Sequence, residues 1–510
     1  MQLKNPRQPL TKSTCNRMAF LTQFRSTRSQ GESENVASRR RFLGQAGAGI
    51  IGSVALASLM GDRTAAATLD ERGPLAPRSA HFPPRARNVI FLNMVGGPSQ
   101  LDLFDYKPEL VRWHGRRLDT AAIKDTPFTT PNEDGYFCHG PQWKFRQAGR
   151  NGAWLSELLP HHERALDHLT FIPSMHTNEF NHVPAQLLFS TGSPRAGRPT
   201  MGSWITYGLG SENSHLPGFI VMQSGRAGSC GAVCWGSGFM PGAYQGVPFR
   251  AAGEPVLHSA NPPGISPSLR RRTLDTIRSF NESSYTRYGD PETLTRLDAF
   301  ELAFRMQTSV PELTDVSREP AHVFELYGAE HGQNSFANHC LLARRLVERG
   351  VRFVQLDHGN WDHHGTGGDD SNLMRGLPER CRAVDQASSA LVLDLAHRGL
   401  LKETLVIWAG EFGRHPAAQG KPSADHAGRD HQRTGYTIWL AGGGVKPGLL
   451  YGETDALGMR ATTNPVHVHD LQATILRLLG LDHTQLTYRH QGRDFRLTDI
   501  HGRVVSDLIA

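Results

Sequence analysis

The chain has 510 residues, which is long enough for one large domain or for two or three ordinary ones. Its formal charge at pH 7 is +7, and this excess comes from the first 67 residues, which hold 10 Lys and Arg against 3 Asp and Glu. The remaining chain carries 45 residues of each sign, so it lacks the clustered cations that attract a nucleic acid backbone, and a nucleic acid partner is excluded.

An export signal is predicted at residues 1–67. Arg39 and Arg40 stand at the start of an apolar run, rich in Gly and Ala, that extends to Met60, and the small residues at 64–67 offer a cleavage site. A basic start, a weakly apolar middle and small residues at the end are typical of a secretory signal, and the arginine pair indicates its twin-arginine version. We therefore expect recognition by the twin-arginine export machinery.

Export implies that the mature protein works in the periplasm or outside the cell. Glycines interrupt the apolar run, which makes it a poor membrane span, and no other apolar stretch of the sequence approaches membrane length. Translation starts at either Met1 or Met18, since the second choice would give the signal a more ordinary leader. Cys230 and Cys234 either form a disulfide in an oxidising compartment or remain two buried thiols.

The rest of the chain is predicted to be a linker followed by one large domain. Residues 68–86 are rich in Pro and Arg, which is typical of a linker, and residues 87–510 hold the regular elements. Within that domain, residues 224–310 are richer in Gly, Pro and Ser and less periodic, which predicts an insertion or a cap.

Apolar strands and amphipathic helices alternate through this domain. A buried strand is predicted at 88–92, followed by a loop at Gly96-Gly97-Pro98. Later strands are predicted at 351–356, 404–409 and 436–440, with helices at 337–348, 384–395 and 468–479. This alternation predicts an α/β fold with a mostly parallel central sheet and helices on both faces. In such sheets, ligands bind beyond the carboxyl ends of the strands.

Three clusters of acidic residues and histidines follow predicted strands. The first runs from Asp357 to Gly365, the second is Glu411-Phe412-Gly413-Arg414-His415, and the third joins Asp425-His426 to Asp430-His431. Carboxylate and imidazole ligands suit divalent ions, with Zn²⁺ expected first and Mn²⁺, Fe²⁺ or Ca²⁺ as alternatives. Such an ion lowers the pKa of bound water or acts as a Lewis acid on an ester. Three clusters at strand ends favour a metal site over solvated polar loops.

Several motifs in the mature chain match one family of secreted bacterial proteins. They are Gly96-Gly97-Pro98-Ser99-Gln100-Leu101-Asp102, Phe104-Asp105, Asn360-Trp361-Asp362-His363-His364, Gly410-Glu411-Phe412-Gly413-Arg414, Asp430-His431, Gly492-Arg493-Asp494 and Leu497-Thr498-Asp499. Over roughly residues 85–510, the chain resembles the family catalogued as domain of unknown function 1501. That family resembles in turn the alkaline phosphatase/sulfatase superfamily, whose members use paired metals to hydrolyse phosphate or sulfate esters. The resemblance therefore implies an alkaline phosphatase-like fold.

One intact metal site is implied by this resemblance. Asp357 and Asp362 stand where the superfamily places acidic ligands after a strand, and His364 is the histidine ligand that follows them. His431, with Asp430 before it, occupies the position of a late histidine ligand. These residues are the expected ligands of the ion.

The same resemblance implies an altered second site. Gly96-Gly97 stands in place of the superfamily's first acidic ligand, and His182 in place of its nucleophile. Glu411-Phe412 replaces its late Asp-His pair, and the formylglycine motif of the sulfatases is absent. The second site is either rebuilt from Asp102, His182 and Glu411 or lost.

Two main classes of function follow. The first is a metal-dependent hydrolase of phosphate or sulfate esters, acting on a small anionic ester or a sulfated glycan, with His182, Glu411 and Arg414 as candidate catalytic residues. The second is a non-catalytic relative that binds an anionic ligand, a sulfated glycan or a partner protein, since the chain offers no standard nucleophile; a purely structural secreted protein is a third reading. Under the first, His182 faces the same cavity as Asp362, His364 and His431; otherwise it caps a helix or fills a loop.

Overall fold

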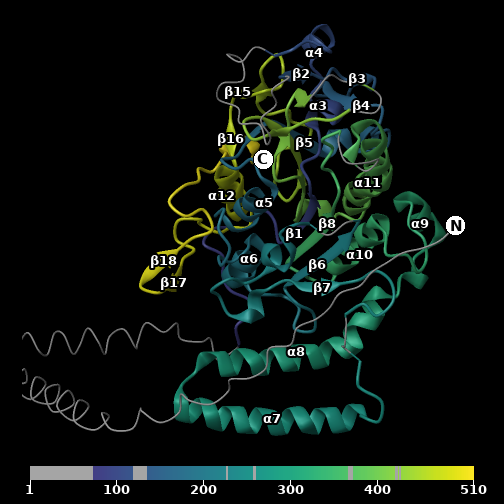
Figure 1. The fold of residues 1–510 in the computed structure, drawn as a ribbon. Helices are drawn as coiled ribbons and strands as arrows, with labels where there is room; N and C mark the ends of the chain where they lie inside the picture. The colour runs from purple at the N-terminus through teal and green to yellow at the C-terminus, as the bar shows by residue number, and fades with distance from the viewer. Residues whose placement is uncertain are drawn as a thin grey trace, which may run out of the picture. The chain divides into compact units, whose positions relative to one another are not determined.

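In the computed structural model, an eight-stranded sheet in the order β16-β5-β13-β9-β1-β8-β6-β7 forms the centre of the fold (Figure 1). Its strands in chain order are β1 (Asn88–Met94), β5 (Leu169–His176), β6 (Phe219–Ser224), β7 (Val247–Phe249), β8 (Phe353–His358), β9 (Thr404–Ala409), β13 (Tyr436–Gly442) and β16 (Val466–His467). Neighbouring strands are parallel, except that β13 is antiparallel to both β5 and β9. The predicted α/β class with a mostly parallel central sheet is confirmed.

The structure describes residues 73–118, 135–225, 228–256, 260–365, 371–419, 423 and 427–510. The predicted export signal with Arg39 and Arg40 lies outside the described residues, and so does Asp425-His426 of the third cluster. Among the helices of the described part, none combines the length and the apolar character needed to cross a membrane.

Strand β13 reaches the functional edge of the sheet with its first residue, because it runs against its neighbours. Tyr436 pairs with Met175 near the end of β5, whereas Gly442 pairs with Leu405 near the start of β9. The segment that precedes Tyr436 therefore lies at the edge where the parallel strands end. The expectation that the third cluster follows a strand of the sheet was wrong, since His431 precedes β13, but the antiparallel direction brings it to the expected edge.

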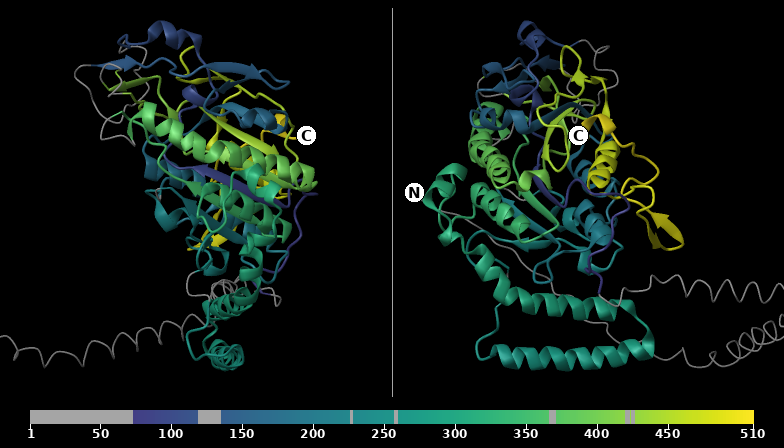
Figure 2. Two further views of the ribbon diagram at one scale, coloured as in Figure 1. Left: turned by 90° about the vertical axis from the view of Figure 1, so that its right-hand side faces the viewer. Right: turned by 180° about the vertical axis from the view of Figure 1, so that it is seen from behind.

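Helices cover both faces of the sheet (Figure 2). Successive residues of a strand point to opposite faces, and in the middle of β1, at residues 89–92, both sets are apolar. Ile90 and Leu92 pack on the side of α10 and α11, whereas Val89 and Phe91 pack on the side of α5, α6 and α12. These helices are α5 (His182–Thr191), α6 (Met201–Leu209), α10 (Phe336–Glu348), α11 (Leu373–His397) and α12 (Val468–Leu478). The central strands are thus buried on both sides, as their unbroken apolar runs predict.

The segment predicted as a weakly periodic insertion contains two long helices, α7 (Pro267–Tyr288) and α8 (Pro291–Thr314). Figures 1 and 2 show them side by side, beyond the β7 end of the sheet. Leu274 is the one residue of α7 that is buried, so this helix has no apolar stripe that a periodicity search detects. The overlooked signals are the N-cap Ser266 before Pro267 and the left-handed Gly289 at the carboxyl end.

The remaining described elements are short. They are α3 (Gln100–Leu103), α4 (Pro108–Trp113), α9 (Ala321–Tyr327), β2 (Tyr136–Cys138), β3 (Phe145–Ala148), β4 (Ala153–Ser156), β10 (Gly413–Arg414), β11 (Ala417–Gln419), β12 (His431–Gln432), β14 (Glu453–Thr454), β15 (Ala461–Thr463), β17 (Tyr488–His490) and β18 (Arg493–Phe495), with several 3₁₀ turns between them. The pairing of β10 with β12 matters most here, because it sets Arg414 opposite His431 at the functional edge.

Candidate metal centre

Four side chains from three distant segments converge at the carboxyl edge of the sheet. One donor atom from each of His182, Asp362, His364 and His431 lies within 4.8 Å of all the others. His182 is the first residue of α5, which follows β5, and Asp362 and His364 lie in the loop after β8. His431 belongs to β12, shortly before β13. The prediction that these four side chains face one another is confirmed.

Asp362 is the hub of this cluster. Its Oδ1 atom lies 3.0 Å from Nε2 of His364 and 3.4 Å from Nε2 of His431, and its Oδ2 atom lies 3.2 Å from Nε2 of His182. Burial alone would raise the pKa of Asp362, but the guanidinium of Arg414 and the hydrogen bonds from His182 and His364 hold that pKa well below its usual range. Asp362 is therefore ionised, and with 39 % of its side chain exposed the cluster is open to solvent.

His431 presents a lone pair to the cluster. Its Nδ1 atom lies 2.6 Å from the carbonyl oxygen of Phe180, which only accepts, so Nδ1 donates. Burial lowers the pKa of His431 to about 4, and Nε2 of the neutral ring is therefore unprotonated. That Nε2 atom lies 2.9 Å from Nε2 of His364. A histidine oriented by a backbone carbonyl in this way is the usual form of a metal ligand.

His182 is held between two carboxylates. Its Nδ1 atom lies 2.7 Å from Oε1 of Glu411, and its Nε2 atom faces Asp362 without making a well-aligned hydrogen bond. Burial alone would lower the pKa of His182, but the carboxylates of Asp362 and Glu411 overcome this effect and raise it to about 9. Without a metal, the ring is thus charged at neutral pH and forms an ion pair with each of the two carboxylates.

Glu411 is buried behind His182. Both of its carboxylate oxygens lie 3.1 Å from the backbone nitrogen of Gly96, and Gln186 donates to Oε1 at 3.2 Å. Burial raises the pKa of Glu411, but its contacts with His182 outweigh burial and lower it. Gly96 has φ +118, and a Cβ atom there would lie 2.7 Å from the backbone nitrogen of Trp361. The departure from an acidic residue at position 96 therefore has a physical reason, because only glycine fits against this loop.

A family model described as "Protein of unknown function (DUF1501)" matches residues 86–509. The chain belongs to this family. Among curated proteins, none matches the chain.

Solved structures that this DUF1501 protein matches include sulfatases and alkaline phosphatases, as the resemblance implied. The PsFucS1 sulfatase from Pseudoalteromonas sp. matches at 12% identity and a TM-score of 0.33, over 78% of this chain and 68% of that chain. An alkaline phosphatase superfamily protein from Vibrio parahaemolyticus matches at 10% identity and a TM-score of 0.31, over 80% of this chain and 70% of that chain. A magnesium-bound mutant of the TAB5 alkaline phosphatase matches at 11% identity and a TM-score of 0.32, over 78% of this chain and 99% of that chain.

Arg414, a candidate catalytic residue, is a buried clamp in this DUF1501 protein. Its guanidinium donates to the carbonyls of Gly96 and Gly97, to the carbonyl of Arg429 and to Oδ1 of Asp362, the last at 2.6 Å. The side chain is 1 % exposed. These contacts place Arg414 behind Asp362, where it positions the carboxylate, rather than at a surface that a substrate reaches.

Asp102 does not join the cluster. Its two carboxylate oxygens lie 2.6 and 3.0 Å from the guanidinium nitrogens of Arg429, and both side chains are fully buried. A carboxylate neutralised in this way is not available to an ion. The rebuilt second site of Asp102, His182 and Glu411 is therefore not assembled, and the cluster around Asp362 is the one ligand group of its kind in the described residues.

Asp357 and Asp430 also lie outside the group of four. Asp357 is buried at the end of β8, where Asn93 and Gln355 donate to its Oδ1 atom at 2.8 and 2.9 Å, and burial raises its pKa. Asp430 accepts from the backbone nitrogen of His431 at 2.7 Å and lies 4.0 Å from Nδ1 of His364. The predicted ligand Asp357 is thus a buried, hydrogen-bonded carboxylic acid. Asp430 contacts the backbone of His431 and the ring of His364 but does not belong to the group of four donors.

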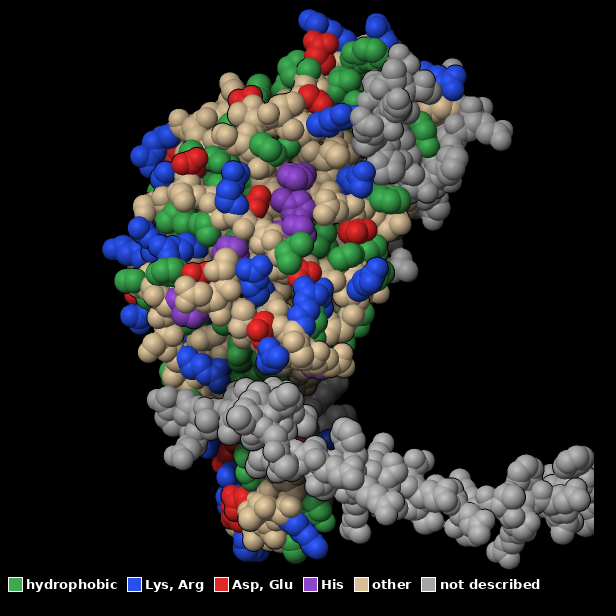
Figure 3. Space-filling model, turned by 90° about the vertical axis from the view of Figure 1, so that its left-hand side faces the viewer, with side chains coloured by type: hydrophobic (Ala, Val, Ile, Leu, Met, Phe, Trp, Pro, Cys, Tyr) green, Lys and Arg blue, Asp and Glu red, His purple; other side chains and the backbone are tan. Residues whose placement is uncertain are grey.

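A further row of histidines lies on the side of β16 and α12, a face on which histidine side chains gather at the surface (Figure 3). The ring centroids of His176 and His467 are 5.0 Å apart, those of His467 and His469 are 4.9 Å apart, and those of His469 and His501 are 5.0 Å apart. Nδ1 of His467 accepts from the backbone nitrogen of His469 and so caps α12. The row thus has a structural use, and its donor atoms do not converge on one point.

Proposed function

We propose that this protein is a metal-dependent hydrolase of phosphate or sulfate esters. The single observation that carries the proposal is the convergence of one carboxylate and three imidazoles, from His182, Asp362, His364 and His431, at the carboxyl edge of the sheet. That edge is where α/β proteins bind ligands. The donor set suits Zn²⁺ first, with Mn²⁺ and Fe²⁺ next, while Ca²⁺ would need more oxygen donors.

Three features of the residues fit a divalent ion. His431 directs an unprotonated Nε2 atom at the cluster, and Nε2 of His182 is buried without a well-aligned partner. Asp362 is ionised. When bound, a divalent ion supplies a Lewis acid to an ester oxygen.

The charged side chains of the centre sum to zero without an ion, and the loss of one proton makes the sum negative, which favours a cation. Asp362 and Glu411 carry two negative charges, which Arg414 and the protonated His182 offset. If His182 gives up its proton to become a ligand, Arg414 alone offsets the two carboxylates, and the net charge of the centre becomes −1. Adding a dication then makes the centre net positive, which favours an anionic ester over a neutral one.

Water is the attacking group in this proposal. The four donor residues and Glu411 carry no hydroxyl or thiol, so they offer no covalent route of the kind that Ser, Thr or formylglycine provides. Glu411 fixes the ring of His182 through Nδ1, and Arg414 fixes the carboxylate of Asp362. The products are an alcohol together with phosphate or sulfate.

We also propose that the protein is exported by the twin-arginine route and acts outside the cytoplasm on a small anionic ester or a sulfated glycan. The arginine pair at Arg39 and Arg40 supports this, and the disulfide between Cys230 and Cys234 agrees with an oxidising compartment.

Metal analysis and hydrolysis assays test the proposed function together. The mature chain is expected to hold one equivalent of a divalent transition metal and to hydrolyse 4-nitrophenyl phosphate or 4-nitrophenyl sulfate. Chelation and Asp362→Ala should both abolish turnover, and readdition of the metal should restore only the wild type. A wild type that holds metal and binds phosphate or sulfate but hydrolyses neither ester would favour the non-catalytic alternative. A wild type that holds no metal overturns the proposal.

A further inference from the structure

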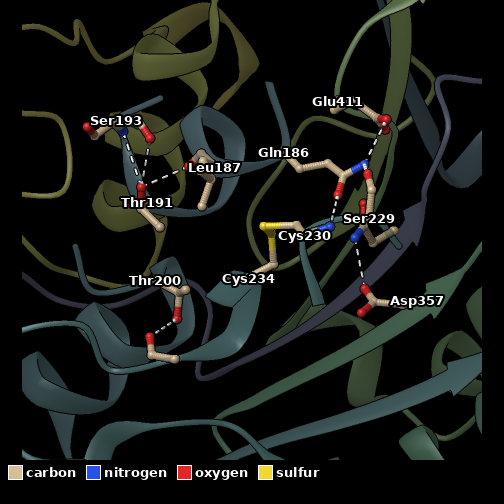
Figure 4. Close-up of a disulfide and its surroundings, with 12 residues drawn as sticks. Gln186, Leu187, Thr191, Ser193, Thr200, Ser229, Cys230, Cys234, Asp357 and Glu411 are labelled. Atoms are coloured by element: carbon tan, nitrogen blue, oxygen red, sulfur yellow. Dashed lines mark hydrogen bonds between the residues drawn. A yellow bond between two sulfur atoms is a disulfide. The ribbon is translucent and has the colours of Figure 1, made fainter. Parts of the chain in front are cut away.

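Gln186 connects the metal centre to a disulfide. Its Oε1 atom accepts from the backbone nitrogen of Cys230 at 3.3 Å, and its Nε2 atom donates to Oε1 of Glu411 at 3.2 Å (Figure 4). Cys230 is bonded to Cys234, which settles the alternative that the sequence left open. Figure 4 shows the amide of Gln186 between the disulfide segment on one side and Glu411 on the other.

The same oxygen of Glu411 receives both Gln186 and His182. Oε1 accepts from Nε2 of Gln186 and lies 2.7 Å from Nδ1 of His182. His182 and Gln186 are four residues apart on α5, so they project from the same face of the helix. This spacing is the sequence signal that could have identified Gln186.

Glutamine suits this position because its amide has a donor and an acceptor. Glu411 needs a donor, and the backbone N–H of Cys230 needs an acceptor, so neither an acid nor an apolar side chain meets both needs. The Gln186 side chain is buried, so water does not replace these bonds without cost.

The Cys230–Cys234 disulfide restrains the backbone N–H group that donates to Gln186. It closes a short loop around the 3₁₀ turn Gly231–Trp235, which restricts the backbone that presents the Cys230 N–H. Cys230 and Cys234 also pack against Leu187, the neighbour of Gln186 on α5. The disulfide is therefore in contact with the helix that carries both His182 and Gln186.

We propose that Gln186 is a positioning residue of the metal centre, fixed by the Cys230–Cys234 disulfide, and that it orients His182 through Glu411. This inference rests on the proposed function, because His182 is taken as a ligand. A carboxylate behind a ligating histidine sets the orientation of the ring, and residues of this outer layer affect metal affinity about 10- to 100-fold.

The variant Gln186→Met tests the positioning role, because it preserves the volume and removes the hydrogen bonds to Glu411 and Cys230, together with a longer one to Oγ of Ser229 at 3.5 Å. Gln472→Met is the matched control. Gln472 is also buried and donates to the backbone of the same helix, at Leu188 and Phe189, but it does not contact Glu411. Thermal unfolding of both variants shows that each is folded before any comparison is made.

The first measurement uses the metal-free protein. Proton and nitrogen NMR of labelled histidines should show a protected, far-downfield Nδ1 proton for His182 in the wild type and in Gln472→Met. In Gln186→Met this resonance should move upfield or be lost to exchange. An unchanged resonance in folded Gln186→Met overturns the positioning role, whether or not the wild type binds metal.

The second measurement is zinc affinity by competition with a chelator. Gln186→Met should bind zinc about tenfold more weakly than the wild type, with Gln472→Met unchanged. The double variant Cys230→Ser/Cys234→Ser keeps the backbone N–H and should show a smaller loss in the same direction. Wild-type binding with no change in Gln186→Met overturns the inference, whereas no zinc binding by the wild type overturns the proposed function and leaves the NMR comparison to decide the role of Gln186.

Discussion

The Nε2 atoms of His364 and His431 lie 2.9 Å apart. Nδ1 of His431 donates to the carbonyl of Phe180, so its Nε2 atom directs a lone pair at His364. A divalent ion shared by the two nitrogens would satisfy both of them, together with Asp362.

Removal of His431 should therefore remove the metal. His431→Ala is expected to weaken binding by at least about 100-fold, beyond the effect of losing an outer-layer partner. The exposed His397→Ala is the matched control and should bind as the wild type does. Metal analysis after dialysis and thermal unfolding with and without chelator measure this. At a free metal concentration of about 100 times the dissociation constant, the wild type should gain about 2.7 kcal/mol from the ion. Equal metal content in both variants would contradict the ligand assignment.

Metal binding should release a proton from His182. Its pKa is raised to about 9 in the metal-free protein, so at pH 7 the ring is charged, and ligation through Nε2 requires the neutral form. The sign follows from mass action: affinity rises with pH below about 9, by about tenfold per pH unit for this one proton, and levels off above it. Calorimetry at pH 7 in buffers of different ionisation enthalpy counts the protons released. Release that is unchanged in His182→Ala would show that His182 is not a ligand.

Replacement of Arg414 should lower the unfolding free energy of the protein, because this side chain holds buried groups in place. Arg414→Met leaves Asp362 without its buried cation and strands the carbonyls of Gly96 and Gly97. Each buried carbonyl left without a donor is expected to cost about 1–3 kcal/mol of unfolding free energy. Denaturant unfolding measures it. A variant that unfolds like the wild type but has lost all turnover would instead point to a direct catalytic contact.

A variant of the Asp102–Arg429 pair tests whether Asp102 is a structural residue or a metal ligand. Asp102→Ala leaves Arg429 charged, buried and unpaired, and is expected to destabilise the fold by about 3–5 kcal/mol. Zinc stoichiometry per folded molecule should nevertheless stay at the wild-type value, measured at a temperature where the variant remains folded. Loss of the ion from folded Asp102→Ala would return Asp102 to the ligand set.

Export should depend on the arginine pair. Replacing Arg39 and Arg40 with Lys keeps the charge of the segment but removes the pair that the twin-arginine receptor reads. The precursor is expected to remain in the cytoplasm, which cell fractionation detects with the unaltered chain as reference. Normal export of this variant would contradict the twin-arginine assignment.

Local patterns in the sequence determined much of the fold. The strand at 404–409 and the helix start near 337 follow from apolar periodicity and capping, because these signals reside in adjacent residues. Acidic and histidine clusters beside the strands indicated the edge of the sheet where the site lies. The resemblance to the alkaline phosphatase/sulfatase superfamily was needed to single out Asp362, His364 and His431 as ligands. The α7 helix escaped detection because an exposed helix needs no apolar stripe.

Tertiary structure alone decided which acids meet the histidines. Asp102 and Asp357 have the same carboxylate as Asp362, yet Arg429 neutralises the first and buried amides hold the second. The partners of these acids are up to 327 residues away along the chain, and no local pattern encodes such pairings. The direction of β13 was equally undetermined, because an apolar run fits a parallel or an antiparallel neighbour. Only the folded chain brings His431 and Glu411 to the same edge, and that arrangement makes the metal centre.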